Sequence, residues 1–365
     1  MSVISYKCPN CDGELIFDPK TQKYKCEYCF SLFSQEELEA MAPAEGAEQK
    51  ADNTGEEQSA KEQSTDAEKA GAQEAEGVIY TCPSCGAEIV TDATTAATFC
   101  YYCHNPVVLG GRLSGEYLPD KVIPFSIEKK EAQKQFYDYL SKKKFIPKAF
   151  FNKKQMEHLS GVYFPYWIYD ISLRGKLKAK ATKTRIWRDH DTEFTETKFY
   201  EIEREGKMEF KDMTENALKK ANRVLAEGIL PYRMEESKPF HMGFLSGFLA
   251  EKRDIAKSEV EETFRSEAKE YATNMLRESV SGYETVTDQK NSFSNRKETF
   301  SYTLLPVWTL TYPGKDGKTY YYSMNAQTGK VCGKLPIDYR KLRFTAFGTA
   351  AVILLVGLLG GYFIW

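Results

Sequence analysis

The sequence predicts an α+β protein with two N-terminal zinc ribbons, a domain of mixed strands and helices with an antiparallel sheet, and one C-terminal transmembrane helix. Three observations lead to this prediction. A pattern of paired cysteines occurs twice near the N-terminus, predicted strands and helices then follow in no regular alternation, and the chain ends in an uncharged apolar stretch. Irregular alternation of strands and helices is typical of α+β folds rather than of doubly wound ones.

The cysteine pattern marks one small module that has been used twice. The cysteines are Cys8, Cys11, Cys26 and Cys29 in the first copy, and Cys82, Cys85, Cys100 and Cys103 in the second. Each cysteine of the second copy lies 74 positions after its counterpart, as Cys82 does after Cys8. Other residues match at the same offset, including Tyr6 with Tyr80 and Glu14 with Glu88. We expect one ribbon at residues 1–33 and another at residues 78–108.

Two CxxC pairs can supply four thiolates in a tetrahedron, the geometry in which structural Zn²⁺ is bound. All four ligand positions are cysteine, so we predict two structural zinc ions and no open position for catalysis. A module of about 30 residues cannot bury enough apolar surface to fold alone, and the metal would supply the missing stability. Gly13 and Gly86 are expected to give the backbone freedom after the first pair. The alternatives are disulfides, iron in the same sulfur cage, and His104 as a ligand.

Between the ribbons, residues 34–77 form a strongly acidic segment. It contains 13 acidic and 3 basic residues and no aromatic residue, although the whole chain has a net charge of only −2. Such a composition cannot build a core, so we predict a disordered spacer that is helical only just after Ser34 and lets the ribbons move independently. Neither ribbon shows the basic patch that nucleic-acid binding requires, so nucleic acid is an unfavoured partner.

Residues 109–160 are expected to connect the ribbons to the main domain through one helix. Ser126 is a plausible N-cap. The residues expected on the apolar face of this helix are Ile127, Ala132, Phe136, Tyr139 and Leu140.

The main domain is predicted at residues 161–336. Two related strings, at residues 161–170 and 302–310, each combine β-forming residues with Pro and Trp, and we interpret them as strands. Trp167 and Trp308 are expected in the core, with ligand stacking as the alternative. Strands at 173–184 and 197–210 are predicted to continue the sheet, with a hairpin turn at Gly206.

Two capping-box patterns predict helices within this domain, one starting at Asp212 and one at Ser258. The first helix would place Leu218, Ala221, Val224 and Leu225 on one face. The second would bury Val260, Phe264, Ala268, Tyr271 and Met275. Further strands are predicted at 283–291, 299–312, 318–324 and 330–334.

The enzyme interpretation has little support in the sequence. Residues 314–319 resemble a phosphate-binding loop, but the glycines are too close together and a Tyr-rich strand follows, so we predict a hairpin turn there. Asp189, His190 and Asp191 are expected in an exposed loop, and Cys332 as a small core residue. We therefore predict that the chain is not an enzyme.

Residues 344–365 contain no charged residue and are long enough to cross a ~30 Å hydrocarbon layer. Arg340, Lys341 and Arg343 precede them, which places the preceding chain on the cytoplasmic side. We predict a basic flank and tail anchor at residues 337–365, hence a single-pass cell-membrane protein. A buried core helix is the alternative. Gly357 and Gly361 form a GxxxG pair that could mediate homo- or hetero-oligomers.

The order of these motifs resembles bacterial TFIIB-type zinc-ribbon-containing membrane proteins. The resemblance rests on the ribbons, Ile123-Pro124-Phe125, the string at 161–170, Gly247-Phe248-Leu249-Ala250-Glu251, and the segment 325–330. It implies a membrane-associated protein whose relatives are linked to phage-shock and flotillin-like membrane-stress systems. Such sequences are often labelled primosomal-helicase-like through the ribbon, but this chain lacks helicase nucleotide-binding motifs.

Together these features predict a membrane-anchored cytoplasmic scaffold that recruits protein partners to the membrane, in a membrane-stress response. Its expected partners are proteins at the cytoplasmic membrane face, including phage-shock or flotillin-like proteins, and membrane lipid around the C-terminal helix. The alternative is a membrane-tethered regulator that binds nucleic acid through its zinc ribbons.

Overall fold

A computed structural model describes residues 6–41, 78–82, 88–100, 105–147, 157–313 and 318–364. The α-helices in these residues are α1 (Gln35–Met41), α2 (Lys129–Ser141), α4 (Arg223–Gly228), α5 (Lys257–Glu278) and α6 (Tyr339–Ile364). The N-terminal strands are β1 (Leu15–Asp18), β2 (Lys23–Cys26), β3 (Leu32–Phe33), β4 (Val78–Thr81), β5 (Glu88–Thr91), β6 (Thr95–Phe99) and β7 (Pro106–Val108). The remaining strands are β8 (Lys121–Val122), β9 (Ser160–Asp189), β10 (Thr192–Asn216), β11 (Lys238–Pro239), β12 (Leu249–Glu251), β13 (Thr285–Pro313), β14 (Thr319–Asn325) and β15 (Val331–Lys334).

The α+β class is confirmed, and the centre of the molecule is a ten-stranded sheet. Its main path runs β11-β8-β13-β9-β12-β6-β7, with β10 beside β9, and β14 and then β15 beside β13. The prediction of an antiparallel sheet was wrong in part, because β12 pairs with β9 and β8 pairs with β13 in parallel. The sheet includes β6 and β7 from the second predicted ribbon and β8 from the predicted connecting segment.

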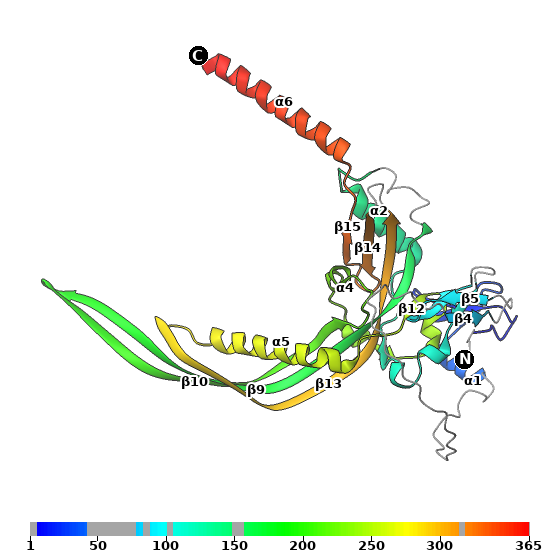
Figure 1. Ribbon diagram of the computed structural model, residues 1–365, viewed down its shortest axis with the longest axis horizontal. Helices are drawn as coiled ribbons and strands as arrows, with labels where there is room; N and C mark the ends of the chain where they lie inside the picture. Colours follow the sequence, from blue (N-terminus) through cyan, green and yellow to red (C-terminus); the bar gives the residue numbers. More distant parts are fainter. Residues whose placement is uncertain are drawn as a thin grey trace, which may run out of the picture.

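Three strands of this sheet continue beyond the body as a long arm, with β9 between β10 and β13 (Figure 1). The 30 residues of β9 correspond to about 100 Å of extended chain. Helix α5 lies along one face of the arm. Buried side chains on that face of the sheet include Leu173, Leu177, Ile202 and Met208.

Helix α5 was predicted, but its buried stripe differs at the C-terminal end. The buried residues are Val260, Phe264, Ala268, Ala272 and Leu276. Tyr271 and Met275, which were expected in the core, are exposed. The buried residues are spaced by four, so their stripe turns slowly around the helix and follows the twisted sheet beneath it. The predicted cap is also displaced, since the Glu259 side chain accepts a hydrogen bond from the Ala256 N–H at 2.8 Å.

Two local predictions around the arm were wrong. The hairpin turn lies at His190 and Asp191, between β9 and β10, whereas Gly206 sits inside β10 opposite Gly175. The helix expected from Asp212 does not form there, because residues Met213–Asn216 pair with β9 after a bulge. Tertiary strand pairing has overridden the local capping pattern. The helix that does follow is the six-residue α4, capped by Asn222, and Val224 on it is exposed.

The strands expected at 283–291 and 299–312 are a single strand, β13. This strand pairs with β9 on both sides of two register shifts, which lie between Thr287 and Lys290 and between Ser294 and Lys297. Bulges let one strand absorb extra residues without ending. The segment 314–317, where a hairpin turn was predicted, lies outside the described residues.

Core packing confirms several other predictions. Trp167 and Trp308 are buried, and their indole N–H groups donate to the backbone oxygens of Ile255 and Ile127. Helix α2 buries Ala132, Phe136 and Leu140 as expected, although Glu128 rather than Ser126 precedes its first turn. Cys332 is half-buried rather than in the core.

Helix α6 rises away from the body, and the described part of its apolar stretch buries nothing against the rest of the chain (Figure 1). Its length and composition would allow it to cross a membrane. Side chains such as Phe344, Phe347 and Ile353 are exposed, which disfavours the alternative of a buried core helix. Its base is attached to the body, since the Asp338 N–H donates to the Phe145 oxygen and the Lys341 ammonium to the Ile146 oxygen.

Candidate metal centre

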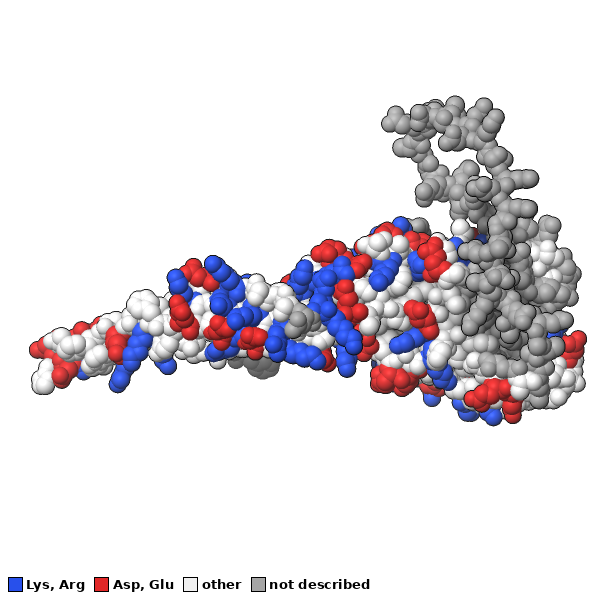
Figure 2. All heavy atoms as spheres, turned by 90° about the horizontal axis from the view of Figure 1, so that it is seen from below, with Lys and Arg blue, Asp and Glu red and all other residues white. Residues whose placement is uncertain are grey.

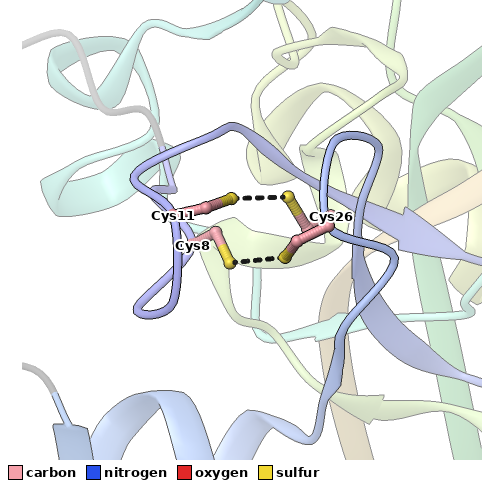
Figure 3. A group of neighbouring side chains, drawn as sticks. Cys8, Cys11 and Cys26 are labelled. Atoms are coloured by element: carbon pink, nitrogen blue, oxygen red, sulfur yellow. Dashed lines mark hydrogen bonds between the residues drawn. The ribbon is translucent and has the colours of Figure 1, made fainter.

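The first four predicted ligands form a compact sulfur cluster (Figure 3). The sulfur atoms of Cys8, Cys11, Cys26 and Cys29 all lie within 4.8 Å of one another. The pairs Cys8–Cys29 and Cys11–Cys26 are each separated by 3.5 Å. A tetrahedral Zn²⁺ with bonds of about 2.3 Å requires sulfur–sulfur distances of about 3.8 Å, which lies inside this range. The cluster could therefore hold a tetrahedral metal ion without rearrangement of the fold.

Two backbone turns of the same form present these sulfurs. The Asp12 N–H donates to the Cys8 oxygen, and the Phe30 N–H donates to the Cys26 oxygen. Asp12 and Phe30 both have φ near +60°. The left-handed backbone conformation, for which Gly13 was expected, thus occurs one residue earlier, at Asp12. Gly13 is required for space instead, because a Cβ there would lie 2.7 Å from the Tyr28 ring and 3.2 Å from the Cys26 sulfur.

The thiols in this cluster influence one another electrostatically. Hydrogen bonding to Ser31 lowers the pKa of Cys29 to about 6. The backbone of Gly13 also favours the thiolate of Cys11, but the neighbouring Cys26 and Cys29 sulfurs outweigh it and raise the pKa of Cys11 to about 12. One thiolate therefore opposes ionisation of the next, and a divalent cation would remove that opposition.

The first ribbon is docked on the body rather than free to move. Its Phe17 N–H donates to the Ser246 oxygen at 3.0 Å, and the Ser246 hydroxyl donates to the Leu15 oxygen at 2.5 Å. The Phe17 ring meets Phe244 edge to face at 5.2 Å. Independent motion of the ribbons was predicted, and these contacts show a fixed position for the first one.

The acidic segment begins with the helix expected after Ser34. The Glu37 N–H donates to the Ser34 hydroxyl, and the Ser34 N–H donates to the Glu37 carboxylate, so the two residues form a capping box at the start of α1. The rest of the predicted spacer, residues 42–77, lies outside the described residues.

The second module repeats backbone features of the first at the offset of 74. The Cys26 N–H donates to the Ser31 oxygen, and the Cys100 N–H donates to the Asn105 oxygen. The β2–β3 register recurs in β6–β7, where Thr98 pairs with Val107 as Tyr24 pairs with Phe33. The Lys7–Glu14 bridge recurs as the Thr81–Glu88 pair.

Two of the four second-module ligands can be placed. Cys82 and Cys100 are buried in a small cluster with Tyr80, Val107 and Leu109. Cys85, Cys103 and the alternative ligand His104 lie outside the described residues.

Strand pairing and polar contacts attach the second module to the body. Strand β6 pairs with β12. The Lys220 ammonium lies 2.7 Å from the Asp92 carboxylate and 2.9 Å from that of Glu251. Burial opposes the charge of Asp92, but hydrogen bonds from Lys220 and Thr95 outweigh it and hold the pKa of Asp92 well below its usual range. Residues 92–95 are thus tied to the central sheet.

Three apolar side chains beside the first sulfur cluster are exposed: Tyr28 by 73%, Phe30 by 70% and Leu32 by 44%. The core of this ribbon is formed by Leu15, Phe17, Tyr24 and Phe33, which are all buried. The sequence carries one signal for this exposure, since Tyr28 and Phe30 flank the predicted ligand Cys29 in the connection between β2 and β3. We call Tyr28, Phe30 and Leu32 the ribbon patch.

The body also contains a cavity of about 450 Å³ between α4 and the sheet. Its walls are largely apolar, with Phe164, Leu225 and Ile229 among them, and its polar lining includes the Lys220–Glu251 ion pair. His190, another candidate from the sequence, is exposed at the tip of the arm beside Asp189, as expected of a loop.

Comparison with curated proteins finds a relative in Bacillus subtilis (strain 168), the uncharacterized protein YdjG. It is 30% identical over 363 residues, which cover 98% of this chain and 99% of the relative. No family model matches the chain. No solved structure matches it either.

Proposed function

This chain belongs to the same family as YdjG of Bacillus subtilis, and we propose that it is a membrane-anchored scaffold that recruits protein partners through its first zinc ribbon. One observation carries the proposal. The ribbon patch is exposed beside a cysteine cluster that could hold a metal ion, in a module fixed to the body. Exposed apolar side chains held by a rigid scaffold are typical of protein-binding surfaces.

The metal in this proposal is zinc, with one structural ion in each ribbon. Cys8, Cys11, Cys26 and Cys29 would hold the first ion. Cys82, Cys85, Cys100 and Cys103 would hold the second, and the repeated backbone registers support that assignment. Four cysteine ligands leave no open coordination position, so the ions would stabilise the ribbons without taking part in a reaction.

Helix α6 would anchor the scaffold as a single membrane span, with the bulk of the chain in the cytoplasm. The basic residues Arg340, Lys341 and Arg343 at the base of the helix support this orientation. Anchoring raises the local concentration of any partner held at the same membrane. We propose that the partners belong to membrane-stress systems, which rests on the resemblance to TFIIB-type zinc-ribbon membrane proteins, and that the role is non-catalytic.

The test is crosslinking of the full-length chain in its native membrane, followed by identification of the attached molecules. Replacement of Tyr28 and Phe30 by Ser should abolish capture of a defined set of proteins while membrane localisation and zinc content persist. Tyr271→Ser is a matched control, because Tyr271 is 52% exposed on α5, outside the ribbons.

Two outcomes would contradict the scaffold function. One is unchanged protein capture by the Tyr28→Ser, Phe30→Ser double variant. The other is salt-sensitive capture of RNA or DNA, which would favour the nucleic-acid-binding alternative.

A further inference from the structure

The arm has two outer edges, one on β10 and one on β13. Strand β10 pairs only with β9 among the described strands, and β13 pairs on its outer side only near its C-terminal end, with β8 and β14. An unpaired edge presents a row of backbone N–H and C=O groups that can accept another strand. Figures 1 and 2 show the arm projecting away from the body, so these edges are accessible along most of their length.

The two edges differ in regularity. Strand β13 is interrupted by register shifts between Thr287 and Lys290 and between Ser294 and Lys297. Bulges of this kind twist an edge and discourage pairing with another chain. Strand β10 has no register shift from Thr192 to Phe210. It is therefore the edge of the arm that is suited to strand pairing.

We propose that β10 pairs antiparallel with β10 of a second copy of this chain, with Tyr200 on the two-fold axis. The dimer joins two arms into one continuous sheet. In this register Glu196 lies opposite Arg204 of the second copy, and Glu193 lies opposite its Lys207. The two-fold axis generates each ion pair twice, and no like charges lie directly opposite one another between Thr192 and Met208.

Neighbouring registers lack this complementarity. A two-fold axis at Lys198 or at Glu201 places that charged residue opposite the same residue of the second copy. An axis at Phe199 places Glu193 opposite Glu205, and one at Ile202 places Glu201 opposite Glu203. Like charges directly opposite each other destabilise a strand pair. The charge pattern of β10 thus selects the register centred on Tyr200. Figure 2 shows Lys and Arg interspersed with Asp and Glu along the visible face of the arm.

The carboxylates of Glu203 and Glu205 do not oppose this register. Glu203 and Glu205 already form ion pairs with Lys176 on β9. In the dimer they lie opposite Thr197 and Thr195 of the second copy, which carry no charge.

A second observation comes from the side chains on the α5 side of β10. Phe194 is 42% exposed and stacks on Trp187, also 42% exposed, at 5.6 Å. The proposed register places Phe194 opposite Gly206 of the second copy. A side chain added at Gly206 would meet no atom within 4 Å, so the space above this glycine is open. An aromatic ring opposite an edge glycine fills such a space and covers its backbone.

The test is disulfide crosslinking of the full-length chain in its native membrane, read as the crosslinked peptide that contains residue 200. Tyr200→Cys should crosslink to itself, because directly opposed residues have Cα atoms about 5 Å apart. Lys198→Cys is the matched control, since its two copies would lie about 13 Å apart along the strands. The chain without an added cysteine controls for the native thiols.

Charge reversal sharpens the test. In the Tyr200→Cys background, Glu196→Arg or Arg204→Glu alone should each reduce crosslinking about tenfold, because two attractive pairs become repulsive. The two reversals together should restore it. None of these variants touches the ribbons, so zinc content and partner capture should stay unchanged and report on the proposed scaffold function separately.

Three results would overturn the dimer. The first is equal crosslinking of Tyr200→Cys and Lys198→Cys. The second is failure of the double reversal to restore crosslinking. The third is a dimer of the Tyr200→Cys variant in which the two copies of residue 200 are not joined by a disulfide. If the Gly357→Leu substitution abolished a dimer that lacks this disulfide, the two chains would associate through α6 instead.

Discussion

The two ribbon modules share a backbone plan but are held in different ways. The first keeps its own three-stranded sheet, β1-β2-β3. Its contacts with the body include η5 (Met242–Leu245), the following Ser246, and the Phe125 oxygen, which accepts from the Gln22 amide. The second contributes β6 to the central sheet through β12. Strand pairing makes β6 and β7 of the second module part of the central sheet. The first module pairs no strand with that sheet and packs on the body through side chains, with Leu15 and Phe17 in the main hydrophobic core. In the proposed scaffold, the second copy would be a structural unit and the first would present the ribbon patch to partners.

The strongest test of this difference is a matched pair of ligand substitutions. Cys26 and Cys100 occupy equivalent positions and are both fully buried. Each serine substitution should remove one zinc ion per chain. Cys100→Ser should also lower the melting temperature of the main domain by about 10 °C. Loss of the zinc ion removes several kcal/mol of stabilisation from the second module, and β6 of that module pairs with β12 of the main domain. Cys26→Ser should lower that transition less, because no strand of the first ribbon pairs with the central sheet, although Cys26 packs against the main core.

Metal analysis and thermal unfolding of the two purified variants in detergent would measure both effects. Equal destabilisation of the main domain by the two variants would show that both ribbons are integral to it, and the proposed division would then be wrong.

A second prediction concerns how closely the first cluster is packed. Gly13→Ala should weaken zinc binding at the first ribbon about tenfold, because the added methyl group displaces the Tyr28 ring and crowds the ligand sulfurs. Competition with a chromogenic chelator would measure the change. Gly206→Ala, at a position with open space, should leave zinc binding intact. Unaltered affinity in Gly13→Ala would mean that the turn can relax around the added methyl group.

A third prediction tests the polar attachment of the second ribbon. Lys220→Met should destabilise the main domain by about 1–3 kcal/mol, because it leaves the largely buried Glu251 carboxylate without its cation. Lys219→Met is the control, since Lys219 is 61% exposed and makes only a surface ion pair with Glu259. Denaturant unfolding compares the two. Equal midpoints for both variants would exclude the Lys220 cluster as an important attachment.

The smallest predicted effect lies on the arm, where an ion pair rather than a metal joins α5 to the sheet. Hydrogen bonds from Arg265 and Tyr169 lower the pKa of Glu298 from 4.5 to about 2. A lowered pKa means that the stabilisation is present above pH 4.5 and is lost as the pH falls toward 2. Glu298→Gln should remove this part of the acid sensitivity. Unfolding curves for both proteins between pH 5 and about 2 would show it, and parallel curves would contradict it.

Much of the molecule could be predicted where the signal is local. The CxxC spacing predicted the first sulfur cluster, the period of α5 predicted most of its buried stripe, and the apolar C-terminus predicted α6. The pairing of strands that are distant in the sequence could not be predicted. The turn at His190 and the continuation of β10 through Asp212 depend on register with β9, which outweighs the capping pattern at Asp212. Docking of the first ribbon depends on Ser246, 231 residues from Leu15, and no local pattern marks such a contact.

Hydrogen exchange at β12 in the Cys26→Ser and Cys100→Ser variants tests the central claim most directly. Strand β12 lies between β6 of the second ribbon and β9 of the arm. We predict faster exchange at Leu249–Glu251 in Cys100→Ser and unchanged exchange there in Cys26→Ser, where only residues of the first ribbon should lose protection. Faster exchange at β12 in Cys26→Ser, or unchanged exchange in Cys100→Ser, would contradict the division of the two ribbons into an attached and an integral copy.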